Sequence, residues 1–359
     1  MTKSTLLDPL SSNPLIGTVI AAQANFCQVY IDPETDAVGG KTILCTRRAR
    51  LQKIGVSVMV GDKVTVEEAD WQGGRGVISD VFPRSSVLDR PPIANADRVL
   101  LLFAFADPAL DPYLLSKFLV KAESTGLEVS LCLNKSDLVS ELERQEWCER
   151  LSGWGYQPIS ISVSDGIGLE ELRVRLDRQI TVFAGHSGVG KSSLTNALIP
   201  NSDIRVATVS GKLSRGRHTT RHVELFTIPT GGSIADTPGF NQPDINCTPT
   251  ELPNYFPEIR QRLAVGNCQF NNCSHRDEPN CVVRGDWERY EHYLDFLADA
   301  TVWQQHLNSQ RNPESSLKRK SRGGAKQFEP KLDSKYRQIS RHTIVRSLDA
   351  ISDEMDSEG

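Results

Sequence analysis

The sequence lacks any apolar run long enough to cross a membrane. Its longest, Val99 to Ala106, falls far short of the roughly 20 residues that a spanning helix needs. The first twenty residues also lack the basic start and the apolar block of a secretory signal. We therefore expect a cytoplasmic chain that does not enter a membrane.

Cysteine is also scarce, with eight in 359 residues, which is too few and too uneven for a disulfide framework. Metal binding is the better explanation for those that cluster. The net charge is only −4, but ten Lys or Arg residues lie between Lys318 and Arg346, against Glu329 and Asp333. That segment can contact phosphate despite the acidic total.

The length predicts two or three domains, and the first, residues 1–89, reads as a small β-barrel. Five short β-type runs are separated by turns: Gly17–Ile20, Cys27–Ile31, Val56–Val60, Lys63–Val66 and Gly76–Ile78. Five strands at this spacing favour an OB-fold, a barrel that often binds oligonucleotides. A barrel serving only as a scaffold is the alternative, because no aromatic-rich strand face is visible to stack bases. Arg47-Arg48-Ala49-Arg50 is the one local indication of an RNA contact.

Arg90-Pro91-Pro92 reads as a linker, and beyond it the apolar period changes. The pattern predicts strands at 99–103, 129–133, 159–163 and 180–184, and helices at 112–124, 141–151, 169–176 and 191–198. Such alternation predicts a mostly parallel α/β sheet over residues 90–242.

A phosphate-binding loop follows the strand predicted at 180–184. The segment Gly185-His186-Ser187-Gly188-Val189-Gly190-Lys191-Ser192 fits G-x-x-x-x-G-K-[ST], and Ser193 follows it. Backbone amides from His186 to Lys191 can surround a β-phosphate, and Lys191 can neutralise β- and γ-oxygens. The Ser192 hydroxyl can ligate Mg²⁺.

The identity of the base is predicted by Asn134-Lys135-Ser136-Asp137, at the end of an apolar strand. Asp137 can accept hydrogen bonds from N1 and N2 of guanine, whereas adenine presents an acceptor at N1. Asn134 can bond the base edge and nearby loops, and the Lys135 stem can lie over the ring. Ser162-Val163-Ser164, at the end of the next strand, can add a backbone contact to guanine. These residues favour GTP.

Two further segments match GTPase switches. Asp236-Thr237-Pro238-Gly239 fits D-x-x-G, in which Asp236 reaches Mg²⁺ through water and the Gly239 amide faces the γ-phosphate. The stretch from Val206 to Arg221 reads as the first switch, and we prefer Thr220 over Thr219 as its Mg²⁺ ligand. The second switch continues into Phe240, which cannot orient an attacking water as glutamine does elsewhere. We therefore expect slow intrinsic hydrolysis. His186 and His218 are candidate substitutes, although a structural or partner-facing role fits each of them better.

The order of these motifs is rotated, because the guanine motif precedes the phosphate loop. A domain whose termini lie close together can keep its packed sheet and site after such a rotation, so we infer a circularly permuted GTPase. Two alternatives stay open: a nucleotide-independent RNA-binding module with a vestigial loop, and a P-loop ATPase or kinase. Intact Lys191, Ser192 and Asp236 argue against the first.

A cysteine cluster predicts a structural metal site. Cys268, Cys273, His275 and Cys281 lie in a polar segment with almost nothing apolar to bury, so a tetrahedral Zn²⁺ is the best reason for its order. Cys247 is a second-choice ligand. We assign residues 243–308 to a zinc-binding and helical domain, in which Trp287, Tyr290, Leu294 and Leu297 share a helix face. Residues 309–359 form a basic then acidic tail, expected to be flexible.

Over roughly residues 15–300, the chain resembles the RsgA (YjeQ) family of small-ribosomal-subunit-dependent GTPases. The resemblance rests on the phosphate-binding loop, His218-Thr219-Thr220, the segment from Asp236 to Phe240, the N-terminal barrel and the Cys/His cluster. The resemblance implies an OB barrel, a permuted GTPase, a zinc domain and a role in late maturation of the 30S subunit. We accordingly expect GTP with Mg²⁺, one Zn²⁺, 16S rRNA as a partner, turnover stimulated by the subunit, and a monomer.

Overall fold

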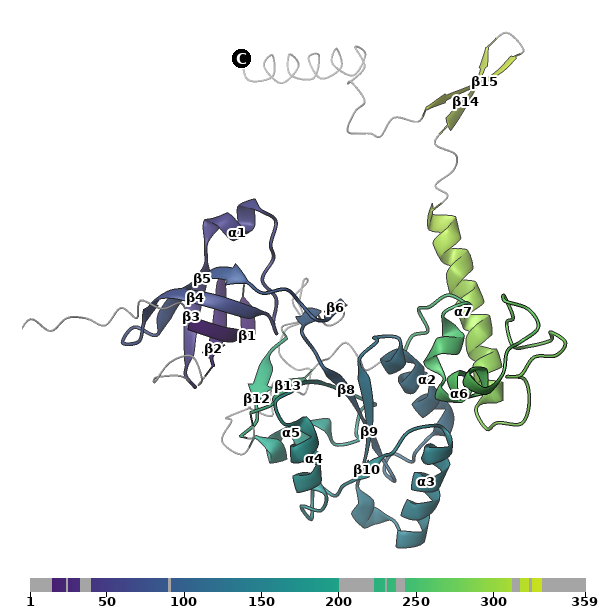
Figure 1. Ribbon diagram of the computed structural model, residues 1–359, viewed down its shortest axis with the longest axis horizontal. Coiled ribbons are helices and arrows are strands. Elements are labelled where there is room, and N and C mark those ends of the chain that lie inside the picture. Colours follow the sequence, from purple (N-terminus) through teal and green to yellow (C-terminus); the bar gives the residue numbers. More distant parts are fainter. Residues whose placement is uncertain are drawn as a thin grey trace, which may run out of the picture. The chain divides into compact units, whose positions relative to one another are not determined.

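A computed structural model describes residues 15–23, 25–32, 40–89, 92–199, 223–229, 231–236, 243–311, 317–322 and 325–330 (Figure 1). The chain divides into two compact units, Met1–Thr301 and Val302–Gly359. Within the described ranges, no helix combines the length and the apolarity that crossing a membrane requires.

The first part of the chain is a closed five-stranded barrel, as predicted, with the strand order β1-β2-β3-β5-β4 (Figure 1). Inward and outward residues alternate along each strand, because side chains from all five fill the interior. The elements are β1 (Leu15–Gln23), β2 (Phe26–Ile31), β3 (Thr42–Arg47), α1 (Ala49–Lys53), β4 (Lys63–Asp70) and β5 (Arg75–Val81).

One predicted strand of the barrel is wrong. The third strand is Thr42–Arg47, which pairs with β2 on one side and β5 on the other. The segment Val56–Val60 alternates because Val58 and Val60 are buried, yet its described ladder contact is a single bridge from Val60 to Ile93. Its period therefore arises from packing and not from strand pairing.

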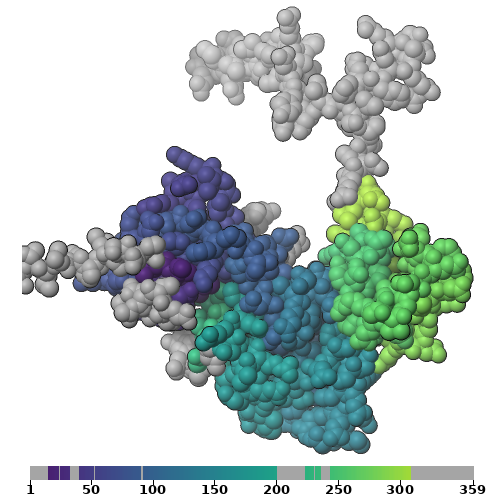
Figure 2. Space-filling model, in the orientation of Figure 1, coloured from purple at the N-terminus to yellow at the C-terminus, as the bar shows by residue number. Residues whose placement is uncertain are grey.

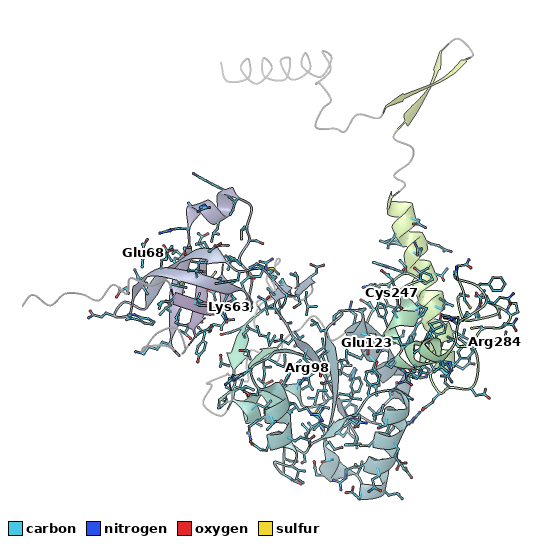
Figure 3. All side chains as sticks on the ribbon, viewed as in Figure 1. Lys63, Glu68, Arg98, Glu123, Cys247 and Arg284 are labelled. Carbon is cyan, nitrogen blue, oxygen red and sulfur yellow. The ribbon has the colours of Figure 1, made fainter. Side chains whose placement is uncertain are left out.

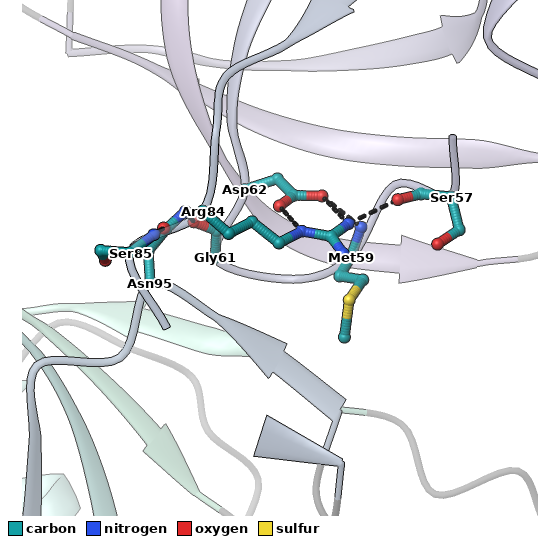
Figure 4. Close-up of polar contacts among 7 residues, drawn as sticks. All are labelled: Ser57, Met59, Gly61, Asp62, Arg84, Ser85 and Asn95. Carbon is teal, nitrogen blue, oxygen red and sulfur yellow. Dashed lines mark hydrogen bonds and ion pairs between the residues drawn. The ribbon is translucent and has the colours of Figure 1, made fainter. Parts of the chain in front are cut away.

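Pro92, the last residue of the segment predicted as a linker, begins the strand β7 (Pro92–Ala94), which pairs antiparallel with β6 (Val87–Asp89) and places Pro92 opposite Asp89. Arg90 and Pro91 lie outside the described residues. Polar contacts tie this region to the barrel (Figure 4). The fully buried Asp62 accepts hydrogen bonds from Arg84 Nε at 2.7 Å and from the Met59 amide at 2.7 Å. Asn95 Nδ2 donates to the Gly61 carbonyl at 2.9 Å. Because a buried carboxylate needs such compensation, Arg84 is a structural residue.

A six-stranded sheet follows, in the order β10-β9-β8-β11-β13-β12, parallel except for β12. Its strands are β8 (Arg98–Ala104), β9 (Glu128–Asn134), β10 (Ile159–Ser160), β11 (Ile180–Ala184), β12 (Leu225–Thr227) and β13 (Ser233–Asp236). The helices are α2 (Pro112–Glu123), the 3₁₀ turn η1 (Ser136–Leu138), α3 (Glu141–Gly153), α4 (Leu169–Leu176) and α5 (Lys191–Leu198). The predicted parallel α/β domain is confirmed, although β10 is shorter than the predicted strand.

Two hydrophobic cores hold the sheet between layers of helices. Side chains of α2 and α3 pack on one face of the strands, and those of α4 and α5 pack on the other. Every residue of β8 is buried because both faces are covered. Because β8, β9, β10, β11 and β13 pair in parallel, their carboxyl ends lie at one edge of the sheet.

The segment after the sheet contains η3 (Leu252–Tyr255), α6 (Pro257–Val265) and α7 (Tyr290–Arg311). Its core includes Phe256, Tyr293 and Phe296. Trp287 precedes α7 and so does not belong to the helix face predicted for it; it packs against this core only as a partly buried residue. In Figure 2 these green residues pack directly against the blue and teal central domain.

Polar contacts reinforce that packing. Glu123, labelled in Figure 3, accepts hydrogen bonds from Tyr156 Oη at 2.9 Å and Arg260 Nη1 at 2.9 Å. Arg289 is fully buried, pairs with Glu258 through Nε at 2.8 Å, and its guanidinium lies over the Trp154 ring. The central domain and the C-terminal helices therefore share one polar and aromatic contact region.

The second unit includes β14 (Leu317–Arg322) and β15 (Ala325–Pro330), which form an antiparallel hairpin. These strands lie inside the segment that the sequence predicts as a flexible tail, as does the end of α7.

Candidate nucleotide and metal sites

The predicted phosphate loop joins the carboxyl end of β11 to the first turn of α5. Because β11 lies between β8 and β13, the loop lies near the middle of the sheet edge that the carboxyl ends of the strands form. Open α/β sheets bind ligands at this edge, and the amides of a helix N-terminus attract anions. The bounds predicted for the strand and the helix on either side of the loop agree with those of β11 and α5.

Two glycines of the loop are required by packing. Gly185 has φ +144°, and a Cβ there would lie 2.1 Å from the Leu102 carbonyl oxygen. Gly190 has φ +98°, and a Cβ there would lie 2.4 Å from Asn134 Nδ2. Neither position admits a side chain. The two glycines are therefore required because the loop lies close to β8 and β9.

The lysine of the loop is held against the loop itself. Lys191 Nζ donates to the carbonyls of Gly185 at 2.8 Å and His186 at 2.7 Å. Ser192 is half-buried in the first turn of α5, whereas Ser193 and the His186 side chain are exposed. An ammonium group in this position can exchange the two carbonyls for phosphate oxygens.

The guanine motif lies beside the phosphate loop, although the two are distant in sequence. Asn134, only 3% exposed, ends β9 and donates from Nδ2 to the Val189 carbonyl at 2.9 Å. Its Oδ1 accepts from the Val163 amide at 3.3 Å. One side chain thus joins three predicted segments: the guanine motif, the phosphate loop and the 162–164 loop.

Asp137 is held as an ionised acceptor. Its Oδ1 accepts from Ser162 Oγ at 2.6 Å, and this hydrogen bond lowers the pKa of the Asp137 carboxyl. Ser162 Oγ also lies 2.9 Å from Ser164 Oγ. An exposed carboxylate fixed in this way can accept two N–H donors, the pattern on the guanine edge.

The sequence reasoning missed Asp107, in the loop after β8. Lys135, whose backbone is left-handed at φ +60°, donates to the Asp107 carbonyl, and its Nζ lies 3.5 Å from Asp107 Oδ2. The sequence could have indicated Asp107, because this residue follows a buried strand whose end adjoins the phosphate loop. This contact positions the lysine stem that we expect to cover the base.

Asp137→Asn should weaken GTP binding by about 100-fold, because the amide keeps one acceptor oxygen and loses one charge-assisted hydrogen bond, worth about 1.5–3 kcal/mol. Xanthosine triphosphate, which carries a carbonyl at C2, should regain affinity for the variant because the new amide can donate to it. Titration with fluorescent GTP, xanthosine triphosphate and ATP measures this. Asp165→Asn, an exposed change in the neighbouring loop, is the control. Unaltered preference for GTP in the Asp137 variant would contradict the assignment.

The switches are described only in part. Asp236 is the last residue of β13 and pairs in register with Phe183, so its backbone lies at the same sheet edge as the loop. Thr219, Thr220, Gly239, Phe240 and His218 lie outside the described residues. Their roles stay predictions.

The four predicted metal ligands come together in space. Cys268 Sγ lies 3.8 Å from Cys281 Sγ, and His275 Nδ1 lies 3.6 Å and 3.4 Å from these two sulfurs. All four ligand atoms, with that of Cys273, lie within 4.8 Å of one another. A tetrahedral Zn²⁺ with its usual bond lengths sets sulfurs about 3.8 Å apart and sulfur and nitrogen about 3.5 Å apart. The donor set and its geometry therefore fit zinc.

Groups around the cluster hold its ligands in place. The Tyr293 hydroxyl donates to the Ser274 carbonyl at 2.7 Å, and the Tyr290 hydroxyl donates to the His275 carbonyl at 2.9 Å. Burial lowers the pKa of His275, which keeps the imidazole neutral, as a metal ligand must be. Burial raises the pKa of the Cys273 thiol to about 12, and a bound Zn²⁺ would reverse this by taking up the thiolate.

Two other cysteines are not part of the cluster. Cys247, labelled in Figure 3, packs in the core of the C-terminal helices, so the geometry favours the four ligands of first choice. Cys132 is buried on β9, as predicted for a core residue.

Comparisons with known proteins agree with these sites. The family model described as RsgA GTPase matches residues 81–246. A curated relative, the small ribosomal subunit biogenesis GTPase RsgA 1 of Nostoc sp., is 60% identical over 94% of this chain and 97% of its own length. The relative from Synechocystis sp. is 48% identical over 95% of this chain and 96% of its own.

Two crystal structures are similar over most of the chain. YjeQ from Thermotoga maritima is 32% identical, with a TM-score of 0.65, and the match covers 80% of this chain and 99% of that one. YloQ, described as a circularly permuted GTPase, is 30% identical, with a TM-score of 0.67, over 84% and 98% of the two chains.

Proposed function

Because this chain belongs to the RsgA family of circularly permuted GTPases, we propose that it hydrolyses GTP to time a step in late maturation of the 30S ribosomal subunit. Its relatives carry the name of small ribosomal subunit biogenesis GTPases. The observation that carries the nucleotide assignment is Asn134, which joins the guanine motif to the phosphate loop. The proposed factor acts as a monomer in the cytoplasm and carries one structural Zn²⁺ on its four-ligand cluster.

The proposed chemistry is positioning and charge neutralisation. The loop amides from His186 to Lys191 bind the β-phosphate, and Lys191 leaves its loop carbonyls to neutralise the β- and γ-oxygens. Ser192 and Thr220 would hold Mg²⁺, with Asp236 acting through water; the ion supplies further neutralisation of developing charge. The Gly239 amide would face the γ-phosphate.

The proposed slow step is orientation of the attacking water. Phe240 stands where many GTPases have a polar side chain after D-x-x-G, and it has no donor or acceptor. His186, exposed on the phosphate loop, and His218 are the candidate substitutes. Binding to the subunit would order the switch or supply a polar group, which is how partner proteins accelerate other GTPases.

The outward face of the barrel suits contact with 16S rRNA. Phe26 is 49% exposed on β2, and Tyr30 occupies the same outward row four residues on. Leu44, on the neighbouring strand, is also exposed, and Arg75 pairs in register with it. Aromatic rings beside a cation on the β2–β3 face of an OB barrel can stack bases and contact phosphate. This row was not recognised in the sequence because its aromatics are separated along the strand.

GTP and ATP turnover measured with 30S, with 50S and without ribosomes tests the proposal. We expect 30S alone to raise GTP turnover at least about tenfold, because it supplies the missing water-orienting group. The double variant Phe26→Ala/Tyr30→Ala should lose much of that stimulation and keep its intrinsic turnover. Phe82→Ala, an exposed aromatic elsewhere on the barrel, is the matched control. Fast turnover without a partner would overturn the mechanism, ATP turnover would favour an ATPase, and failure to bind GTP would favour a vestigial loop.

A further inference from the structure

The hairpin of residues 317–330 differs from the rest of the chain in charge. β14 and β15 pair antiparallel in a regular register from Leu317 opposite Pro330 to Arg322 opposite Ala325. In the sequence, the two residues between these strands are glycines. Five Lys or Arg residues lie in this hairpin against one acid, Glu329, in a chain whose net charge is −4.

Strand geometry arranges that charge on both faces. Residues at alternate positions share a face, so Lys318, Lys320 and Arg322 form one row, spaced by about 6.7 Å along the strand. Arg319 belongs to the other face, opposite Phe328, and Lys326 lies opposite Ser321 on that face. The register therefore places lysine or arginine positions on both faces of the ribbon.

The hairpin has little to stabilise it alone. An isolated two-stranded hairpin is marginal in water, and among the strands that the structure describes, β14 and β15 pair only with each other. Few of its residues are apolar, so neither face can build a core. Such a ribbon gains most from a charged partner, which would reduce repulsion among its cations.

We propose that residues 317–330 are an RNA-binding ribbon that contacts the phosphate backbone. The choice of RNA over an acidic protein rests on the proposed function in ribosome assembly. The contact is independent of base sequence, because lysine and arginine rows recognise phosphate charge. It is a second attachment to RNA, in addition to the one proposed for the barrel face.

Matched charge variants of the full chain test this. The first set changes the five hairpin cations to glutamine: Lys318, Arg319, Lys320, Arg322 and Lys326. The control set makes the same change at the five basic residues that follow: Lys331, Lys335, Arg337, Arg341 and Arg346. Binding to a fluorescent RNA duplex of mixed sequence is measured at several KCl concentrations. Intrinsic GTP turnover and the melting temperature verify that each variant is folded.

The hairpin set should weaken RNA binding at least about tenfold at moderate salt, and lower the slope of log affinity against log salt by about 2 or more. The control set should change affinity by less than about threefold. Equal losses of RNA affinity in both sets would show that the whole basic segment contributes by its total charge, and would overturn the proposal of a specific RNA-binding ribbon. Unchanged RNA binding in the hairpin set would overturn it as well, even if subunit binding fell, which would indicate a protein partner.

Failure of this inference is separable from failure of the proposed function. If 30S does not stimulate turnover but the hairpin set still weakens RNA binding, the assembly role fails and the ribbon stands. If stimulation occurs and RNA binding is unchanged in the hairpin set, the ribbon fails alone.

Discussion

Lys191→Ala is expected to lower kcat for GTP hydrolysis by about 1,000-fold, which corresponds to about 4 kcal/mol of transition-state stabilisation. The ammonium group donates to the loop carbonyls of Gly185 and His186, and Lys191 belongs to neither of the two hydrophobic cores of the sheet. The loss should therefore fall on catalysis and phosphate binding more than on folding. Single-turnover hydrolysis at saturating GTP measures the chemical step.

A suitable control for this variant is Lys117→Ala. Lys117 lies on α2 and pairs with Asp299 at 3.6 Å, so it shares the charge of Lys191 without its place in the loop. Its turnover should stay within about twofold of the natural chain, because a partly exposed ion pair contributes little. A decrease of less than tenfold in the Lys191 variant would mean that another cation neutralises the phosphates.

The parts of the fold that were predicted correctly depend on local sequence. The strand 180–184, its glycine loop and the helix from Lys191 were placed with their final bounds, because a buried run, a steric requirement for glycine and a helix start follow one another. The clustering of Cys268, Cys273, His275 and Cys281 was predicted on equally local grounds, since all four lie within fourteen residues.

The parts that were missed depend on contacts between distant residues. The residues of Thr42–Arg47 do not by themselves predict that the segment pairs with β2 and β5. The residues of Val56–Val60 likewise do not predict that its valines are buried in a core without forming a strand. Arg289 is a stronger case. An arginine in a polar segment reads as surface, yet it is buried against Glu258 and Trp154, which come from other parts of the chain.

Removal of the proposed Zn²⁺ is expected to have the largest effect on stability. Structural zinc contributes about 10–16 kcal/mol of apparent binding free energy in small domains, and the Cys268–Cys281 loop has little apolar surface to replace it. Cys273→Ser should therefore reduce bound zinc from one equivalent to far less and lower the melting temperature of the C-terminal helices. Metal analysis and calorimetry of the purified chain measure both.

Two cysteines provide controls for that experiment. Cys148→Ser changes a partly exposed thiol on α3, and Cys247→Ser removes the second-choice ligand from the helical core. Both variants should retain one equivalent of zinc, even if burial of a hydroxyl makes the second less stable. Zinc lost from the Cys247 variant but retained by the Cys273 variant would reassign the ligands.

Cys273→Ser should also separate intrinsic GTP turnover from the proposed stimulation of that turnover by the subunit. The ligand loop is fixed to α7 through Tyr290 and Tyr293, and the core beneath these tyrosines extends to Val120 of α2. The phosphate loop and guanine motif are supported instead by the two cores of the central sheet. Cys273→Ser should therefore keep intrinsic GTP turnover within about threefold and lose most of the proposed stimulation by 30S. If stimulation survived the loss of zinc, the subunit would act on the nucleotide site without the metal-bound segment.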